Sequence, residues 1–209
     1  LGRTTAKLEL VYDAIEQIGG PQPAIYPLNL ETATPKDYED LAATLGREFG
    51  RLDGLVHSAA TLGSLTPISL YNAPLWHQVM QVNLNAPFLL TQQCLPLLQQ
   101  AEQPAILFIN DTIGLQGKAY WGAYGAAKAG LLNLAQTLAS ELENRQNFRV
   151  NTLVPPPLRT SLRARAYPGE DPRRRPRPEI YTPAVLYLLG PDCTATGQVV
   201  TLAAADAEA

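Results

Sequence analysis

Tyr124 and Lys128 stand four residues apart in a stretch, Asp111 to Lys128, that reads DTIGLQGKAYWGAYGAAK. A separation of four places two side chains on one face of a helix, one turn apart. A lysine ammonium beside a phenol favours the phenolate, so it lowers a pKa that is roughly 10 when unperturbed. Such a tyrosine can exchange a proton with a carbonyl oxygen near neutral pH. Alone, the pair is a weak signal, because an exposed Tyr and Lys on an ordinary helix share this spacing.

Length and composition narrow the class of protein. The chain has 209 residues, enough for one domain with a core, and its net charge of −3 provides no basic field for nucleic acid. Two scattered cysteines in apolar runs fit a reducing compartment, and together with two histidines they predict no metal site. No apolar run approaches the roughly 18 residues of a membrane span, and no signal peptide opens the chain. We therefore expect a soluble, cytoplasmic domain that binds neither membrane nor nucleic acid.

The periodicity of apolar residues predicts alternating helices and strands. Helices are expected over residues 4–18, 34–49, 70–99, about 119–143 and 182–189, and strands over 24–28, 52–56, 105–109, 148–154 and 199–202. Strands that alternate with helices and are apolar on both faces indicate an α/β fold, with a parallel sheet between helix layers. Such sheets bind ligands at the carboxyl ends of their strands, where Ser58, Asp111 and Pro155 fall.

Several ordered motifs resemble the short-chain dehydrogenase/reductase family, whose members are nicotinamide-dependent enzymes on a Rossmann-type doubly wound parallel sheet. The motifs are RLDGLVHSAA at 51–60, VNLNAPF at 82–88, the Tyr124/Lys128 pair, RVNTLVP at 149–155 and TGQV at 196–199. The phrases WGAY, MQVNLNA and AYPGEDP look most like the YciK-type bacterial subgroup. The likeness covers nearly the whole chain.

The resemblance implies catalytic roles for three residues. Tyr124 would be the proton donor and acceptor for a small-molecule carbonyl or alcohol substrate. Lys128 would hold the nicotinamide ribose hydroxyls and lower the pKa of Tyr124. Asn83 would support a water relay to the lysine, although a helix Asn that bonds locally is an alternative.

The resemblance also implies a cofactor, NADP (or NAD). Arg3 stands where a cation favours a 2′-phosphate, and Gly2 precedes it instead of an acid that would bind the NAD ribose, which favours NADP. A solvated Arg3 is an equal alternative. Thr160 would touch the carboxamide or pyrophosphate. The other cofactor-binding positions are Asn29, Ser58, Ala59, Ala60 and Pro155, together with Tyr124 and Lys128.

The family's catalytic serine is replaced by Asp111, thirteen residues before the tyrosine. Losing a hydroxyl donor to the developing oxyanion costs about 2.7–4 kcal/mol. An ionised aspartate also repels an alkoxide by ~4 kcal/mol at ~4 Å and an effective dielectric near 20, and it raises the pKa of Tyr124. Three outcomes stay open: the hydroxyl of Thr112 substitutes if the strand has ended, Asp111 donates in its protonated form, or activity is lost.

Other positions depart from the family pattern as well. Ser58 and Ala60 replace its asparagine and glycine, Asn29 replaces an aspartate, and 155–157 is a triple proline that removes amide donors. The glycine-rich turn and the first strand and helix that carry it are absent, which leaves a gap of roughly 9.6 Å, two strand spacings, in the expected sheet. We therefore expect residues 1–209 to be a single, N-terminally truncated domain lacking about 30 upstream residues of the family fold.

Two further segments have expected roles. Residues 156–180 match the family's substrate loop and, being rich in proline, suit a lid; a solvated loop or a nucleic-acid arm are the alternatives for its arginines. The resemblance also implies that the 70–99 and 119–143 helices pair across a homodimer or homotetramer, although plain burial against the sheet is an alternative explanation of their apolar residues. Three functional hypotheses follow: an NADP(H)-dependent oxidoreductase, a catalytically degenerate relative that acts as a cofactor-binding or oligomeric partner, and an inactive fragment.

Overall fold

Among the residues that the structure describes, four parallel strands form one sheet. The structure, a computed structural model, describes residues 1–145 and 147–203. The strands are β1 (Gly54–His57), β2 (Ala105–Ile109), β3 (Arg149–Val154) and β4 (Val199–Thr201), in the order β1-β2-β3-β4. Their register places Val56 beside Leu107 and Leu107 beside Asn151. The expected α/β class with a parallel sheet is confirmed.

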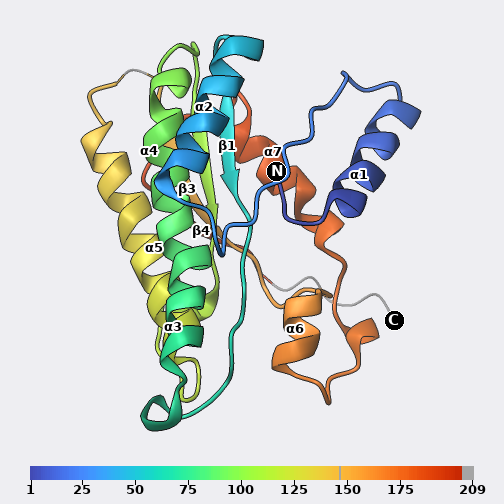
Figure 1. Ribbon diagram of the computed structural model, residues 1–209, viewed down its shortest axis with the longest axis vertical. Helices are drawn as coiled ribbons and strands as arrows, with labels where there is room; N and C mark the ends of the chain where they lie inside the picture. The colour runs from blue at the N-terminus through green and yellow to red at the C-terminus, as the bar shows by residue number, and fades with distance from the viewer. Residues whose placement is uncertain (146, 204–209) are drawn as a thin grey trace.

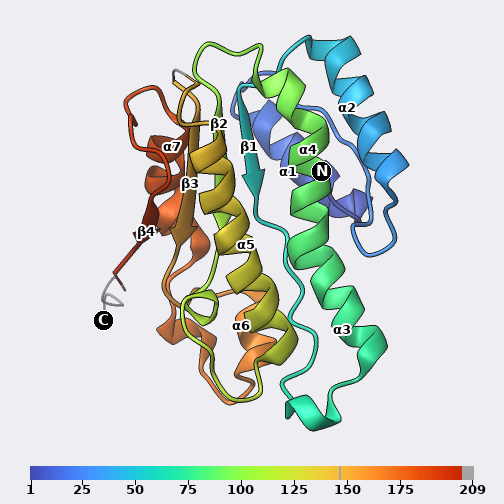
Figure 2. The same cartoon turned by 90° about the vertical axis from the view of Figure 1, so that its left-hand side faces the viewer.

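Helices cover both faces of this sheet. They are α1 (Thr5–Gln17), α2 (Pro35–Phe49), α3 (Ala73–Met80), α4 (Ala86–Leu98), α5 (Gly122–Glu141), α6 (Ser161–Ala166) and α7 (Thr182–Leu189). α4 and α5 lie on one side of the strands and α7 on the other (Figures 1 and 2). Helices on both faces bury the central strands: β2 is an apolar run buried everywhere except Ile109, and β3 is buried along its whole length, its polar Arg149, Asn151 and Thr152 included.

The predicted helix over 70–99 consists of two α-helices joined by a π-helical turn, Gln81–Asn85. The Asn72 side chain caps α3 by accepting a hydrogen bond from the Leu75 amide at 2.9 Å. Pro87 has no N–H to donate to the carbonyl of Asn83, four residues earlier. The backbone hydrogen-bond pattern of the helix therefore lacks one bond at the place where the helix widens into the π-helical turn. This turn carries the buried Asn83 toward the carboxyl end of β1.

The prediction of a strand over 24–28 is wrong. The segment makes a single bridge, Gly2 with Pro27, and the Leu28 amide donates to the Gly2 carbonyl at 2.9 Å. A strand needs a ladder on a neighbouring strand, and among the described residues β2 alone pairs with β1. The 24–28 segment therefore runs beside the sheet without joining it.

Helix α1 also differs from the expected packing. Its bounds match the prediction, but none of its residues is buried, and Leu10, Val11 and the adjacent Ile18 are exposed. Figure 1 shows α1 at the edge of the molecule, away from α4 and α5. Its apolar side chains therefore face solvent, whereas those of a helix in a layer on the sheet would be buried.

In the part of the chain that the structure describes, no helix is long and apolar enough to cross a membrane.

Candidate active site

Tyr124 and Lys128 lie on one face of α5, as the spacing predicts. α5 packs against β3, and both side chains are buried, each 4% exposed. The Lys128 ammonium lies 5.8 Å from the centre of the Tyr124 ring. Both residues line a cavity of about 530 Å³ together with the residues that follow β2 and β3. The pair is therefore in place at the sheet edge where such folds bind ligands.

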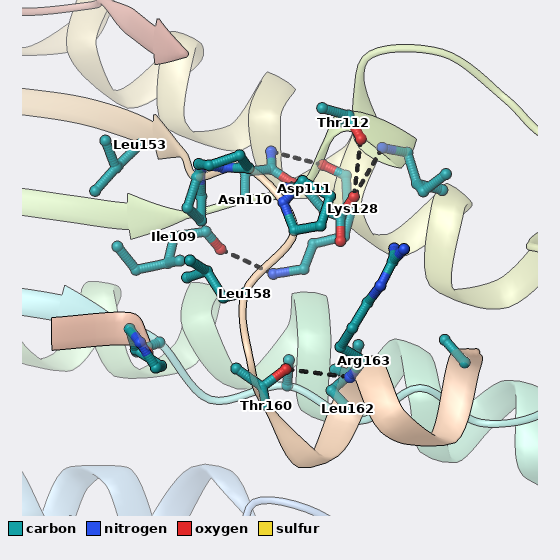
Figure 3. Close-up of a pocket in the computed structure, with 18 of the residues that line it drawn as sticks. Ile109, Asn110, Asp111, Thr112, Lys128, Leu153, Leu158, Thr160, Leu162 and Arg163 are labelled. Carbon is teal, nitrogen blue, oxygen red and sulfur yellow. Dashed lines mark hydrogen bonds between the residues drawn. The ribbon is translucent and has the colours of Figure 1, made fainter. Parts of the chain in front are cut away.

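The Lys128 side chain is held by the end of β2. Its ammonium donates to the Ile109 carbonyl at 2.8 Å, which Figure 3 shows as a dashed line. Burial lowers the pKa of Lys128 to about 8, while the charge of Asp111 opposes this change. An ammonium carries three N–H donors, so two remain for other acceptors.

Asp111 contacts Tyr124 directly. Its Oδ2 accepts the Tyr124 hydroxyl at 3.2 Å, and its Oδ1 accepts the Thr112 hydroxyl at 3.2 Å and the Ile113 amide at 3.0 Å. Asn110 steadies this turn, because its side chain donates to the Lys128 carbonyl at 3.1 Å and accepts the Asp111 amide at 2.9 Å. The aspartate is thereby fixed between β2 and α5.

The pKa of Tyr124 is raised, chiefly by burial and then by the charge and hydrogen bond of Asp111. The Asp111 carboxylate stands in hydrogen-bond contact with the phenol, whereas the Lys128 ammonium is turned to Ile109, so the expected lowering of this pKa by Lys128 stays a prediction. The expectation that Asp111 raises it is confirmed. Tyr124 is consequently a neutral phenol that donates to a carboxylate.

Thr112 lies beyond the strand. β2 ends at Ile109, and Thr112 begins a 3₁₀ turn, Thr112–Gly114, with its side chain exposed at the cavity. The strand has thus ended, which was the condition for its hydroxyl to serve in place of serine. In this structure that hydroxyl donates to Asp111, so it would have to rotate to reach a substrate.

The cavity is closed on one side by the expected lid segment. α6 and the two 3₁₀ turns Pro172–Arg174 and Pro178–Tyr181 give residues 156–180 defined structure. Thr160 caps α6 by accepting the Arg163 amide at 3.1 Å (Figure 3). Of the predicted cofactor residues, those that line this cavity are Ser58, Ala60, Pro155, Thr160, Tyr124 and Lys128.

The remaining cofactor candidates border a second hollow of about 200 Å³, which is lined by Arg3, Asn29, Ala59 and Ala60 among others. Ala60 lines both hollows, so they are neighbours in the structure. The Arg3 guanidinium forms an ion pair with Glu31, and the Asn29 side chain accepts the Glu31 amide at 3.2 Å. The structure therefore brings these residues together but pairs the expected phosphate-binding cation with an acid.

Asn83 forms two hydrogen bonds with the backbone of Thr61. Its side chain accepts the Thr61 amide at 2.9 Å and donates to the Thr61 carbonyl at 2.8 Å. It therefore clamps the chain that follows β1, where Ser58, Ala59 and Ala60 lie. The implied role in a water relay stays a prediction.

Sequence analysis missed a cluster within the lid segment. Glu170 accepts hydrogen bonds from Arg163, at 2.6 and 2.9 Å, and from Arg175. These arginines lower the pKa of Glu170 to about 2. The Arg163 guanidinium also lies 3.6 Å from the centre of the Tyr167 ring. A signal was available, because Glu170 and Asp171 are the only acids among the arginines of 159–177.

Comparisons with known proteins agree with this geometry. The family model described as short chain dehydrogenase matches residues 1–171. The oxidoreductase YciK of Escherichia coli K12 is 41% identical over 192 residues, which cover 92% of this chain and 75% of that protein. A short chain dehydrogenase structure from Pseudomonas syringae has 47% identity and a TM-score of 0.93, covering 96% of this chain and 81% of that one. One from Escherichia coli CFT073, complexed with NADPH, has 39% identity and a TM-score of 0.91, covering 96% and 83%.

Proposed function

Because the chain belongs to the short chain dehydrogenase family, we propose that it is an NADP(H)-dependent oxidoreductase that interconverts a carbonyl group and an alcohol. The observation that carries this proposal is the buried Tyr124–Lys128 pair, which faces a cavity at the carboxyl ends of β2 and β3. The similar structure with bound NADPH supports the choice of cofactor.

The residues fit a nicotinamide dinucleotide. Two neighbouring hollows that share Ala60 suit the two halves of an elongated ligand, and the two N–H donors that Lys128 does not give to Ile109 suit the hydroxyls of a ribose. Arg3 and Asn29 would border the adenosine half of the cofactor. Arg3 would then leave its ion pair with Glu31 and bind the 2′-phosphate. When bound, NADPH supplies a hydride to the substrate carbon.

Residues of this chain would transfer the proton. In the direction of reduction, Tyr124 gives its hydroxyl proton to the substrate oxygen, while Lys128 stabilises the resulting phenolate from the next turn of α5. The Tyr124 hydroxyl must first leave Asp111, its partner at 3.2 Å. α6 lines one side of the cavity around this step and limits the access of water from that side.

A fluorescence titration of the chain with NADPH and NADH, followed by a screen of carbonyl substrates, tests the proposal. We expect NADPH to bind more tightly than NADH. Tyr124→Phe should retain NADPH binding and lose at least a hundredfold in turnover, because general acid catalysis contributes typically 10²–10⁴-fold. Failure of both cofactors to bind would overturn the proposal.

The second candidate is a catalytically degenerate relative that binds cofactor and acts as an oligomeric partner. The observation that favours it is the hydrogen bond that ties Tyr124 to Asp111. Asp111→Ser distinguishes the two functions. A large gain in turnover with unchanged NADPH binding would identify a decayed site, whereas a loss of turnover would give Asp111 a role of its own.

We also propose a homodimer or homotetramer formed through α3, α4 and α5. Phe88 on α4 is 44% exposed, although the chain around it is apolar and packed. Light scattering coupled to size-exclusion chromatography would test this, and Phe88→Glu should shift the molecule toward the monomer.

A further inference from the structure

We infer that the substrate carries a protonated nitrogen beside its reacting carbon, as in an amino ketone or an amino alcohol, and that Asp111 binds this cation. The inference rests on the proposed function and deepens it by naming the substrate class. It starts from the charges that face the cavity.

Three ionic side chains line the cavity within the described part of the chain: Asp111, Lys128 and Arg163. The Arg163 guanidinium is paired with Glu170 through hydrogen bonds of 2.6 and 2.9 Å, and the Lys128 ammonium is bonded to the Ile109 carbonyl. Asp111 is the one carboxylate on the cavity wall, and its contacts there are with neutral donors. Asp111 therefore presents a negative charge beside Tyr124, opposite in sign to the Lys128 ammonium that lies 5.8 Å from the centre of the Tyr124 ring.

That negative charge opposes reduction of a neutral ketone. The alkoxide that forms beside Tyr124 would stand near Asp111, and like charges repel. A positive nitrogen on the neighbouring carbon reverses the effect, because it attracts the carboxylate and offsets the charge of the developing alkoxide. It also draws Asp111 away from the Tyr124 hydroxyl, which frees the phenol to donate to the substrate oxygen.

The walls suit a cation that carries an aryl group. The rings of Trp121 and Tyr167 lie 6.0 Å apart, and those of Trp121 and Tyr124 lie 5.7 Å apart. Tyr181 also lines the cavity. Aromatic rings stack on aryl groups. Because the Tyr167 ring already contacts the Arg163 guanidinium at 3.6 Å, the aryl group of the ligand, and not its ammonium, would contact these rings. An aryl amino alcohol thus matches both the charge and the lining.

Binding tests the inference without turnover. Isothermal titration calorimetry would compare 2-(dimethylamino)-1-phenylethanol with 1-phenylethanol, its neutral counterpart, with and without NADP. We expect the amine to bind at least tenfold more tightly and Asp111→Asn to remove the difference. Asp171→Asn, which deletes an acid outside the cavity lining, should preserve it. Equal affinities, or a preference that survives Asp111→Asn in a variant with an unchanged circular dichroism spectrum, would overturn the inference; Asp111→Ser serves if the asparagine variant does not fold.

Turnover separates this inference from the proposed function. With NADPH, 2-(dimethylamino)acetophenone should be reduced with a kcat/KM at least tenfold above that of acetophenone. Reduction of both ketones at equal rates would overturn the inference and leave the proposed function standing. Tight, Asp111-dependent binding of the amine without reduction of either ketone would support the inference and contradict the proposed function.

Discussion

At the scale of the residue, His57 shows how burial sets a charge state. The His57 ring stacks on Phe108, with 4.7 Å between ring centres, and its Nε2 is hydrogen-bonded to the Thr91 hydroxyl at 2.8 Å. Burial, helped by the charge of Lys128, lowers the pKa of His57 to about 3. The imidazole is therefore neutral in the folded protein at any pH above that value.

This predicts a loss of stability in acid. Below about pH 6.5 the unfolded chain protonates His57, whereas the folded chain does not until about pH 3. The unfolded state binds more protons in this window. The free energy of unfolding therefore decreases as the pH is lowered, by up to about 1.4 kcal/mol per pH unit. Urea denaturation between pH 7 and pH 4 measures the slope. His57→Phe should flatten it, since this variant has no imidazole to protonate; identical slopes in the two proteins would contradict the assignment.

At the scale of the element, the lid segment over 156–180 is held by charge pairs. Glu170 joins Arg163 of α6 to Arg175, and the Arg159 side chain donates to the carbonyls of Pro172, Arg173 and Arg175. The Arg163 and Glu170 side chains are only 22% and 19% exposed. One carboxylate therefore connects α6 to Arg175 across the proline-rich loop and steadies the wall of the cavity.

We predict that Glu170→Gln loosens this wall. The variant loses the charge that binds two arginines, so trypsin should cut within residues 159–177 at least threefold faster, while the rest of the chain stays resistant. KM for an active substrate should rise several-fold with little change in kcat, because the lid touches substrate rather than the reacting atoms. Asp171→Asn is the matched control, since Asp171 pairs with the exposed Arg173. Equal digestion of both variants would show that Glu170 does not hold the lid.

The same elements show how far sequence could predict this site. The Tyr124–Lys128 spacing lies within one helix, so local periodicity was enough to place the pair on one face. The sign of the effect of Asp111 on Tyr124 followed from charge alone. The strand expected over 24–28 failed because a strand depends on a distant partner, and no local pattern shows whether the partner is present. The Glu170 cluster depends in the same way on folding of the loop.

At the scale of the whole molecule, the sheet has an open flank. A groove of about 590 Å³ runs beside β1, lined by Leu55 and Val56, by Leu41 and Leu45 of α2, and by the 24–26 segment. In the described part of the chain no strand other than β2 pairs with β1, and Val56 is 40% exposed. Unpaired edges and exposed apolar surface favour association with other chains.

We therefore predict that the purified chain binds the dye 8-anilinonaphthalene-1-sulfonate and that its light scattering rises more steeply than in proportion to its concentration, because the chains associate. Val56→Lys should lower both dye fluorescence and scattering at least twofold, because a charge in the groove disfavours apolar ligands and edge pairing. The far-ultraviolet circular dichroism spectrum should not change. Leu186→Lys is the matched control, since Leu186 on α7 is 63% exposed and lies outside the groove lining. If both variants reduce the signals equally, the apolar surface responsible lies elsewhere; if Val56→Lys alone reduces them, the flank of β1 is the site of association.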